Sequence, residues 1–315
     1  MSASGEAWLA VVNPAAGRGR GLRTLPALEA EMRRACLSME VRTTARRGHA
    51  VAIAAGALAA GYRRFLAVGG DGTVNEVANG LLGAGAVRGT EITLGTLPVG
   101  TGNDWARTHA LPRRVPEVVR LLAGGRTVVH DAGVVACRAG GQETRRFFVN
   151  MAGVGIDAHI LQRLGEGKGG TWSYLAALLA GLRTFASPAL EIAGPDFLFR
   201  GRALAVFMGP GRYCGGGLEI APHAAVDDGT LHMTLVRHMS ALQVLVSLPR
   251  LFNGTVPQSP HVVARRVSSL EIASDPPAGV EVDGEVIGTT PARVAILPRA
   301  IRAVTARPAR RAGLH

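Results

Sequence analysis

The chain has 315 residues, of which 47% are hydrophobic and 42 are glycine, and it carries a formal net charge of +12. This length allows two domains, and the composition is that of a globular, turn-rich protein. Only 4% of the residues are aromatic, and no basic stripe alternates with stacking side chains. The positive charge therefore does not indicate a nucleic-acid partner.

Segments that direct a chain to a membrane or out of the cell are not expected in this sequence. The longest apolar stretch, residues 174–182, is about half the length that crosses a bilayer. The first residues lack the basic and apolar regions of a secretory leader. Cys36, Cys137 and Cys214 are widely spaced and predict neither structural zinc nor a disulfide framework. We therefore expect a cytoplasmic protein.

Residues 1 to about 126 alternate short apolar runs with amphipathic segments. Strands are expected at 8–12, 40–43, 65–68 and 92–95, and helices at 25–36, 50–58, 73–82 and 117–123. Thr73 and Glu76 have the spacing of a capping box, which places the start of the third helix at Thr73. Such alternation predicts a doubly wound parallel sheet, a Rossmann-like α/β unit.

The rest of the chain is rich in short strands separated by Gly, Pro and Asp. Strands are expected at 128–129, 134–135, 147–149, 203–207, 231–236, 262–263, 270–272 and 294–297. Two helical insertions are expected, at 172–185 and at 240–252, the second capped by Ser240. This pattern predicts an antiparallel β-sandwich.

Three glycine-containing loops follow expected strands of the first region, at 13–21, 69–76 and 97–105. In a doubly wound sheet such loops gather at the carboxyl ends of the strands, where ligands bind. A glycine loop that opens a helix offers free N–H groups and the positive end of a dipole to phosphate. Asp71 would repel a bare phosphate, so a divalent cation is expected between them. For GGDG alone, a glycine turn with a helix-start Asp is the alternative.

The segments NPAAGRGRG, GGDGTVNEVANG and LPVGTGNDWAR together resemble the diacylglycerol kinase catalytic domain family, which includes bacterial lipid kinases and the sphingosine and ceramide kinases. GGG at 215–217, IAP at 220–222, DDG at 227–229 and VDGE at 282–285 follow in the family's order. The resemblance covers nearly the whole chain. It implies a nucleotide-binding domain over 1–126, to which about 301–315 returns, and a β-sandwich acceptor domain over 127–300. GGDGT alone is shared with NAD kinases and phosphofructokinases.

The resemblance implies which residues surround ATP. The matching positions are Asn13, Pro14, Ala15, Ala16, Gly17, Thr44, Gly69, Gly70, Asp71, Gly72, Thr73, Val74, Asn75 and Thr101. Thr44 fits equally well as an ordinary threonine at the end of a strand. Arg18 stands where the family often has lysine, and its guanidinium can still clamp a phosphate.

The resemblance also assigns metal ligands and catalytic groups. Asp71 and Asp104 would organise the catalytic Mg²⁺ through water, although Asp104 alone also fits a helix N-cap. Asp283 would be the general base, supported by Glu285, whereas the residues by themselves favour a plain hairpin turn. A structural Mg²⁺ would be held by Asp228 and by the carbonyl groups of Ala225 and Thr230. Two adjacent carboxylates before a glycine are otherwise a solvated turn.

The sequence says less about the acceptor. Trp172, Tyr174, Leu178 and Leu182 are candidates for a lipid pocket and equally good core residues. Pro210 stands where many relatives have asparagine, five residues before the triple glycine, and it lacks a backbone donor. This departure bears on acceptor specificity more than on transfer.

The function expected from these motifs is an ATP- and Mg²⁺-dependent lipid kinase that phosphorylates a hydroxyl of diacylglycerol or a related lipid. Such an enzyme would be cytoplasmic and would work at the inner membrane surface, with Arg163, Lys168 and Arg183 flanking the docking face. An NAD-kinase-like enzyme and a non-catalytic nucleotide-binding regulator are the alternatives. The GTGND and DGE elements favour the lipid kinase. The sequence leaves open which lipid is used and whether the protein is a homodimer.

Overall fold

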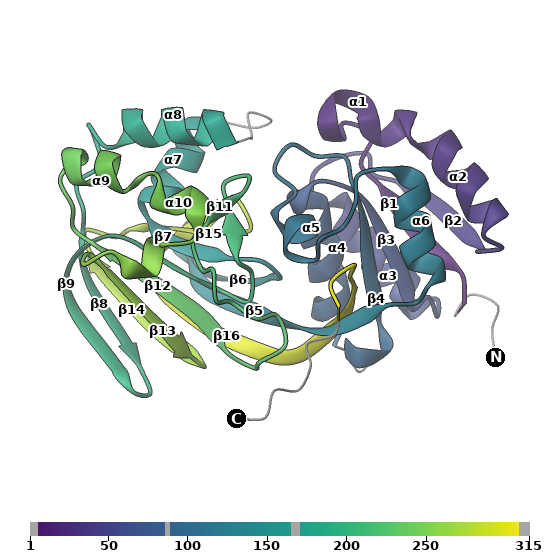
Figure 1. The fold of residues 1–315 in the computed structure, drawn as a ribbon. Helices are drawn as coiled ribbons and strands as arrows, with labels where there is room; N and C mark the ends of the chain where they lie inside the picture. The colour runs from purple at the N-terminus through teal and green to yellow at the C-terminus, as the bar shows by residue number, and fades with distance from the viewer. Residues whose placement is uncertain (1–5, 86–88, 165–170, 309–315) are drawn as a thin grey trace. The chain divides into compact units, whose positions relative to one another are not determined.

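The computed structural model describes residues 6–85, 89–164 and 171–308 (Figure 1). The chain forms two compact units. The first unit consists of Met1–Gly100, Ala106–His130 and Arg299–His315, and the second consists of Thr101–Trp105 and Asp131–Pro298. The short segment 101–105, expected in the first domain, groups with the second unit. The predicted fold class, an α/β unit followed by a β-sandwich-like unit, is confirmed.

The first unit is built on a parallel sheet. Its strands are β1 (Trp8–Val12), β2 (Met39–Thr43), β3 (Arg64–Gly69), β4 (Thr93–Pro98) and the end of β16 (Glu285–Val304). β1 lies between β2 and β3, β3 pairs with β4, and β4 pairs with β16, all in parallel. Arg302 of β16 lies in register with Thr93 of β4, so the end of the last strand pairs with this sheet.

The helices of this region follow the strands in alternation. They are α1 (Ala16–Arg23), α2 (Leu25–Arg34), α3 (His49–Ala59), α4 (Asp71–Gly83), α5 (Asp104–Thr108) and α6 (Val115–Ala123). All five residues of β1 are buried, as are five of the six in β3, because helices cover both faces of a sheet of this kind. Leu28 and Met32 of α2 and Val118 and Leu122 of α6 pack against these strands in one apolar core.

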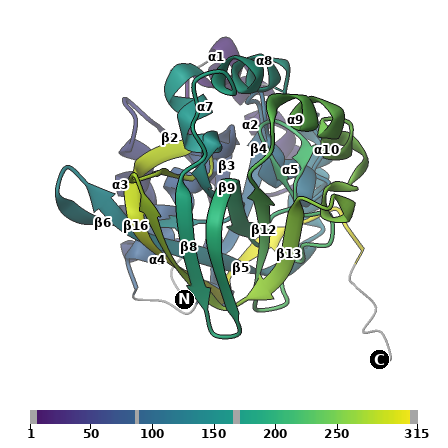
Figure 2. The same ribbon diagram turned by 90° about the vertical axis from the view of Figure 1, so that its left-hand side faces the viewer.

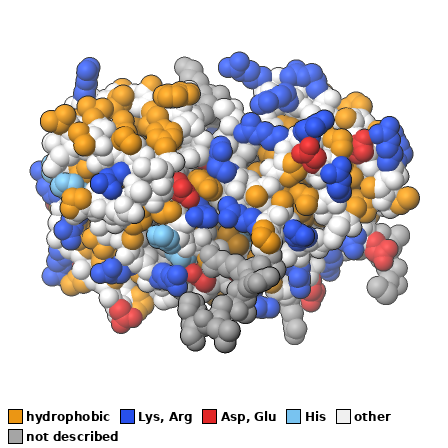
Figure 3. Space-filling model, viewed as in Figure 1, with side chains coloured by type: hydrophobic (Ala, Val, Ile, Leu, Met, Phe, Trp, Pro, Cys, Tyr) orange, Lys and Arg blue, Asp and Glu red, His pale blue; other side chains and the backbone are white. Residues whose placement is uncertain are grey.

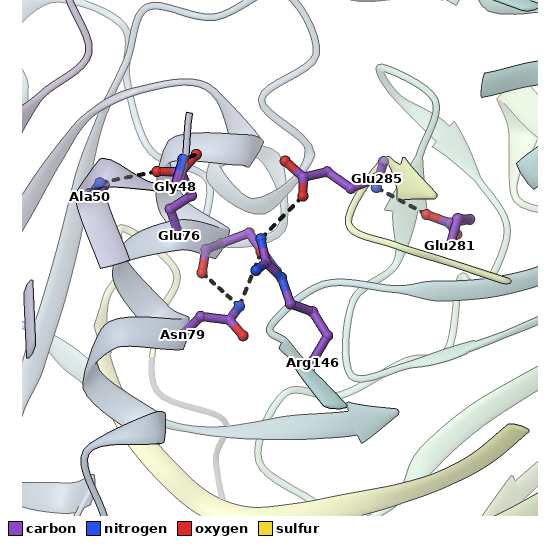
Figure 4. Close-up of polar contacts among 9 residues, drawn as sticks. Gly48, Ala50, Glu76, Asn79, Arg146, Glu281 and Glu285 are labelled. Atoms are coloured by element: carbon purple, nitrogen blue, oxygen red, sulfur yellow. Dashed lines mark hydrogen bonds and ion pairs between the residues drawn. The ribbon is translucent and has the colours of Figure 1, made fainter. Parts of the chain in front are cut away.

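The predicted start of α4 is wrong. The helix begins at Asp71, its N-cap is the extended Gly70, and no side chain caps it. Glu76 does not reach back to the start of its own helix. Its carboxylate instead accepts hydrogen bonds from the backbone N–H groups of Gly48 (2.8 Å) and Ala50 (3.1 Å), at the start of α3 (Figure 4). Glu76 therefore caps the start of α3 instead of α4, because the first N–H groups of any helix have no acceptor within the helix.

The second unit is an antiparallel structure. Its longer strands are β5 (Thr127–Ala139), β6 (Gln142–Phe148), β7 (Ala152–Gly155), β8 (Ala189–Gly194), β9 (Phe197–Gly209), β12 (Leu231–Arg237), β13 (Val262–Val267), β14 (Ser269–Asp275), β15 (Gly279–Val282) and most of β16. β10 (Tyr213–Cys214) and β11 (Leu218–Glu219) form a separate short pair. The pairings β9–β7–β15–β16–β14–β8–β9 close a ring. Each strand of the ring therefore has a partner strand on both sides.

Four helices gather at one end of the strands of this unit (Figures 1 and 2). They are α7 (Ile156–Leu164), α8 (Thr171–Gly181), α9 (Ala241–Ser247) and α10 (Arg250–Asn253). The predicted N-cap at Ser240 is confirmed, with Gln243 completing a capping box. The single helix expected over 240–252 is wrong: it breaks before Pro249, because proline has no N–H to continue the helix. None of the described helices is long and apolar enough to span a membrane.

Candidate active site

The three glycine loops of the first unit lie together at the carboxyl ends of their strands. Asn13, directly after β1, donates from its side-chain amide to the hydroxyl of Thr73 in the second loop (3.4 Å). A Cβ on Gly17 would lie 2.0 Å from the carbonyl oxygen of Val99, and one on Gly70 would lie 3.2 Å from Cα of Gly100. Glycine is therefore required at position 17 for the close approach of the loops, and at position 70 a side chain would be tightly packed. The predicted gathering of the loops is confirmed up to Gly100.

The first loop folds back on itself within α1. Gly17, Arg18 and Gly19 all have positive φ, so the backbone leaves the helical path there. The side chain of Arg20 donates to the carbonyl of Gly17 (3.1 Å), and that of Arg23 donates to the carbonyl of Arg18 (3.2 Å). Two of the three arginines thus stabilise the loop itself. The side chain of Arg18, at the position where the family often has lysine, is exposed.

The second loop opens α4, and its glycines differ in what they touch. A Cβ on Gly69 would lie 2.2 Å from the hydroxyl oxygen of Thr73, so packing within the loop explains this glycine. A Cβ on Gly72 would meet nothing within 4 Å, and its φ is not positive. Nothing in the described residues therefore requires glycine at position 72. Open space beside the first turn of a helix is where an anion can approach backbone N–H groups.

Thr44 follows β2 and lies in the same unit. Its backbone N–H donates to the carbonyl of Val12 (2.9 Å), next to Asn13. The residue is buried. This contact fits both readings of Thr44, a nucleotide contact and a strand-end residue, and its role stays a prediction.

Thr101 and Asp104 belong to the short segment that groups with the second unit. Asp104 is the first residue of α5 and is buried. Its Oδ2 accepts a hydrogen bond from the backbone N–H of Gly216 (2.8 Å), in the triple glycine. Gly215, Gly216 and Gly217 all have positive φ. The triple glycine therefore turns the backbone so that an N–H can hold Asp104.

The DGE segment forms the tight turn between β15 and β16. Asp283 and Gly284 have φ of 45° and 87°, the left-handed pair of a two-residue hairpin turn. The carboxylate of Asp283 accepts three backbone hydrogen bonds, from Val149 (3.0 Å), Asn150 (3.0 Å) and Met151 (2.8 Å). These donors fix the orientation of the carboxylate and stabilise its negative charge.

Glu285 is held by a cation from another strand. Its carboxylate lies 3.1 Å from a guanidinium nitrogen of Arg146 on β6, and both side chains are largely buried (Figure 4). No local pattern points to Arg146, because it lies 139 residues from Glu285 along the chain.

The segment after β9 contains the Pro210 departure. Gly211 donates to the carbonyl of Asn150 (2.8 Å), and the side-chain amide of Asn150 donates to the carbonyl of Tyr213 (2.7 Å). A Cβ on Gly211 would lie 2.1 Å from Oδ1 of Asn150. An asparagine from the end of β6 is thus packed against this segment and also supplies a donor to Asp283.

In the loop of the expected structural magnesium, both carboxylate oxygens of Asp228 have protein partners. Oδ1 of Asp228 accepts from the backbone N–H (3.1 Å) and the hydroxyl (2.8 Å) of Thr230, and Oδ2 lies 3.0 Å from Nε2 of His232. The backbone N of Ala225 lies 3.2 Å from the same ring nitrogen. The described residues contain no cluster of three or more acidic, histidine or cysteine side chains that suits a metal. The expected site uses one carboxylate and two carbonyl groups, which is a different kind of ligand set, so the structural magnesium stays a prediction.

An apolar cavity of about 90 Å³ lies among the helices of the second unit. It is lined from α8, α9, α10, β9 and β12, among others by Tyr174, Leu178, Leu204, Val244, Leu248 and Leu251. Of the four pocket candidates, Tyr174 and Leu178 line the cavity. Leu182 packs against the adjacent core, and Trp172 is 82% exposed.

Comparison with known proteins places both units in one family. Residues 7–135 match the model of the diacylglycerol kinase catalytic domain, and residues 150–305 match the YegS C-terminal NAD kinase beta sandwich-like domain. A "Probable lipid kinase YegS-like" of Klebsiella pneumoniae (strain 342) is 33% identical over 84% of this chain and 86% of its own length. A protein of the same name from Pseudomonas syringae pv. syringae (strain B728a) is 32% identical over 86% of this chain and 85% of its own length.

A solved structure agrees on the fold. A diacylglycerol kinase from Bacillus anthracis str. Sterne superposes with a TM-score of 0.72 at 23% identity, covering 95% of this chain and 97% of that chain. The chain belongs to the diacylglycerol kinase catalytic domain family of lipid kinases. It is therefore an enzyme of the phosphotransferase class.

Proposed function

We propose that the protein transfers the γ-phosphoryl group of MgATP to a hydroxyl of diacylglycerol or a closely related lipid. The observation that carries this proposal is the convergence of three glycine loops at the carboxyl ends of β1, β3 and β4, in a chain of this family. Those loops offer backbone N–H groups rather than side-chain chemistry, as a site that positions a triphosphate requires.

The triphosphate binds against the first turn of α4. Gly72 leaves open space there, and Asn13 and Thr73 tie the first loop to the second. Asp71 begins the helix beside this space. Its carboxylate suits the magnesium ion that accompanies ATP, since magnesium prefers oxygen ligands and keeps several of its waters. Bound magnesium neutralises charge on the phosphates, and the loops of the protein hold them in position.

Asp283 is the general base. The acceptor oxygen forms a bond to the γ-phosphorus, the bond from that phosphorus to the β–γ bridging oxygen breaks, and the hydroxyl proton moves to the Asp283 carboxylate. The products are ADP and the phosphorylated lipid. Three backbone N–H groups hold this carboxylate in one orientation, which a base needs if it is to be aimed at a hydroxyl. Glu285, paired with Arg146, supports the same turn.

The apolar part of the acceptor enters the cavity among α8, α9 and α10. Its described lining is almost wholly aliphatic and aromatic, with Ser247, Ser259 and Arg250 as the polar members. A pocket of this composition favours a hydrocarbon chain over the polar body of a dinucleotide such as NAD. At about 90 Å³ it admits part of an acyl chain, so the rest stays in the lipid phase.

The protein docks reversibly on the inner membrane surface through the helices that surround this cavity. Their outer faces expose Trp172 (82%), Leu242 (70%), Val246 (73%) and Phe252 (52%), and Figure 3 shows hydrophobic side chains gathered over α8 and α9. Residues 229–270 contain four arginines and no acidic residue, which suits an anionic leaflet. Arg163 and Arg183 are exposed beside α8, and Lys168 lies outside the described residues.

Vesicle co-sedimentation tests the docking. Binding is expected to require anionic lipid, to weaken at high salt, and to fall in a Leu242→Ser, Val246→Ser double variant. A matched control is Leu198→Ser, which removes another exposed leucine from β9, away from these helices. Binding that ignores lipid charge, salt and the double substitution would contradict the docking proposal.

The acceptor is identified by one assay. The protein is incubated with ATP labelled in the γ-phosphate and, separately, with diacylglycerol, phosphatidylglycerol, a sphingoid base, ceramide and NAD. We expect label in a lipid, with diacylglycerol foremost. Label in NAD alone would establish the NAD-kinase-like alternative. ATP binding without label in any acceptor would favour the nucleotide-binding regulator.

A further inference from the structure

Two carboxyl groups meet in the interior of the second unit, below the turn that carries Asp283. Asp157 on α7 is 4% exposed and Glu281 on β15 is 3% exposed. Both carboxyl groups face Gly153, where a Cβ would lie 2.6 Å from Oε1 of Glu281 and 3.3 Å from Oδ2 of Asp157. Two ionised carboxylates so close together in a buried position would repel each other, and ionised carboxylates are only acceptors, so a hydrogen bond between the two groups requires one of them to hold a proton.

Each member of the pair has a second partner within the same unit. The hydroxyl of Tyr174 on α8 donates to Oδ1 of Asp157. The backbone N–H of Gly284 donates to Oε2 of Glu281 (3.0 Å; Figure 4). The contacts therefore run from Tyr174 through Asp157 and Glu281 to Gly284, the residue that follows Asp283 in the turn. Tyr174 also lines the apolar cavity, so one end of this chain of contacts lies at the cavity wall.

The surroundings keep one proton in the pair. Burial, and then the charge of Asp157, raise the pKa of Glu281 well above its ordinary value. Burial also raises the pKa of Asp157, but the hydrogen bond from Tyr174 stabilises its charged form. The other groups that face the pair are acids as well: Cys214 of β10 and Asp283 of the turn. Burial together with Asp157 and Asp104 raises the pKa of the Cys214 thiol well above its usual range.

We propose that Asp157 and Glu281 are positioning residues that share one proton and, through the backbone N–H of Gly284, hold the turn in the conformation that aims Asp283. This inference rests on the proposed role of Asp283.

The central experiment compares Glu281→Gln with Glu281→Ala. Glutamine keeps the shape of a protonated glutamic acid: its amide N–H can donate to Asp157, and its carbonyl can accept from Gly284. We expect Glu281→Gln to turn over at close to the wild-type rate at neutral pH. Glu281→Ala releases Gly284, and misplacement of the turn should lower kcat by on the order of 10²-fold with little change in the affinity for ATP. Glu271→Ala, an exposed glutamate on β14, is the matched control.

The pH profile separates positioning from mere packing. In the wild type, kcat should fall as pH rises through the titration of the pair, because the shared proton leaves. Glu281→Gln cannot lose this proton, so its profile should stay flat over the same range. Tyr174→Phe removes the donor that stabilises ionised Asp157, and the fall should move to higher pH. These two substitutions preserve volume and are expected to fold even if Glu281→Ala does not.

Two measurements need no acceptor and keep the inference distinct from the proposed function. Infrared difference spectra between wild type and Glu281→Gln should contain the carbonyl stretch of one protonated carboxylic acid at neutral pH. Amide exchange at Gly284 should be slow in the wild type and in Glu281→Gln, and fast in Glu281→Ala. If no acid band distinguishes the two proteins, or if Glu281→Gln is impaired as severely as Glu281→Ala, the shared proton is refuted. If Gly284 exchanges equally in all variants, the positioning role is refuted, whatever lipid is phosphorylated.

Discussion

In the proposed mechanism, the loops of the first unit and the DGE turn of the second unit serve phosphoryl transfer by opposite means. The phosphate loops rely on the absence of side chains: Gly17 and Gly70 allow backbones to approach closely, and Gly72 leaves a space open. The turn at Asp283 relies on a charged side chain. Three backbone N–H groups, which lie 132 to 134 residues earlier in the chain, hold its carboxylate. In this proposal the first region binds phosphate through its shape and its backbone dipoles, and the second acts through a single oriented carboxylate. Substitutions should therefore fail in different ways in the two regions.

The largest effect is expected from Asp283→Asn. Removing a general base lowers turnover on the order of 10²–10⁴-fold. The amide group also cannot accept all three backbone hydrogen bonds, so some loss of thermal stability should accompany the kinetic loss. Affinity for ATP, measured by calorimetry, should stay near wild type because the phosphate loops are intact. Turnover close to wild type would show that another group takes the proton.

A second substitution should produce the reverse pattern. Gly72→Val fills the open space at the start of α4 and should weaken ATP binding on the order of 10²-fold, about 2.7 kcal/mol. The fold should tolerate it, because a Cβ there meets nothing within 4 Å. Gly56→Val is the matched control: it also lies inside a helix, its φ is not positive, and its Cβ would meet nothing. If both variants bind ATP equally well, the triphosphate does not lie against α4.

The hydrogen bonds of Glu76 provide a test of stability within the first unit. This buried carboxylate satisfies two N–H groups at the start of α3, and hydrogen bonds to charged groups contribute roughly 1.5–3 kcal/mol each. Glu76→Ala should lower the free energy of unfolding by at least the contribution of one such bond, about 1.5–3 kcal/mol. Denaturant titration measures this change. The control Glu117→Ala removes an exposed carboxylate from α6 and should change little. Equal effects would mean that Glu76 does not stabilise α3.

The buried pair in the second unit predicts a smaller, pH-dependent effect. The pKa of Glu281 is raised in the folded protein, so between its ordinary and its raised value the folded state binds more protons than the unfolded state. The free energy of unfolding should therefore fall as pH rises through this window. Glu281→Gln should reduce this slope, as followed by thermal melts at a series of pH values. If the slope of stability against pH is the same in Glu281→Gln as in the wild type, a group other than Glu281 titrates in this window.

The sequence predicted the first unit more completely than the second. Strands β1 and β3 and helix α3 lie within about one residue of their expected bounds, since each is a short periodic run between turn residues. The gathering of the loops could be predicted because it follows from the parallel topology alone. The start of α4 could not, because the partner that recruits Glu76 lies on another helix.

In the second unit, the motif pointed to Asp283 and Glu285, but not to the backbone donors that hold the Asp283 carboxylate or to Arg146. The sequence predicts two short strands where the structure has the continuous strand β5. The apolar pattern breaks at His130 and Asp131, which are polar although they are buried in the middle of this strand. Helix α7, which carries Asp157, was not predicted. Its first turn follows a glycine-rich strand, and Asp157 is a charged residue in a buried position. Buried charges are placed by tertiary contacts, which no local pattern records.

The proposed assignment of the nucleotide to the first unit and of the acceptor to the second is tested most directly by amide hydrogen exchange, measured with each substrate in turn. Addition of MgATP should slow exchange in residues 13–21 and 69–75 and leave α8, α9 and α10 unchanged. Addition of a short-chain diacylglycerol should slow exchange in those three helices and leave the loops of the first unit unchanged. Protection of α8–α10 by MgATP, or of the glycine loops by diacylglycerol alone, would contradict the assignment of nucleotide and acceptor to the two units.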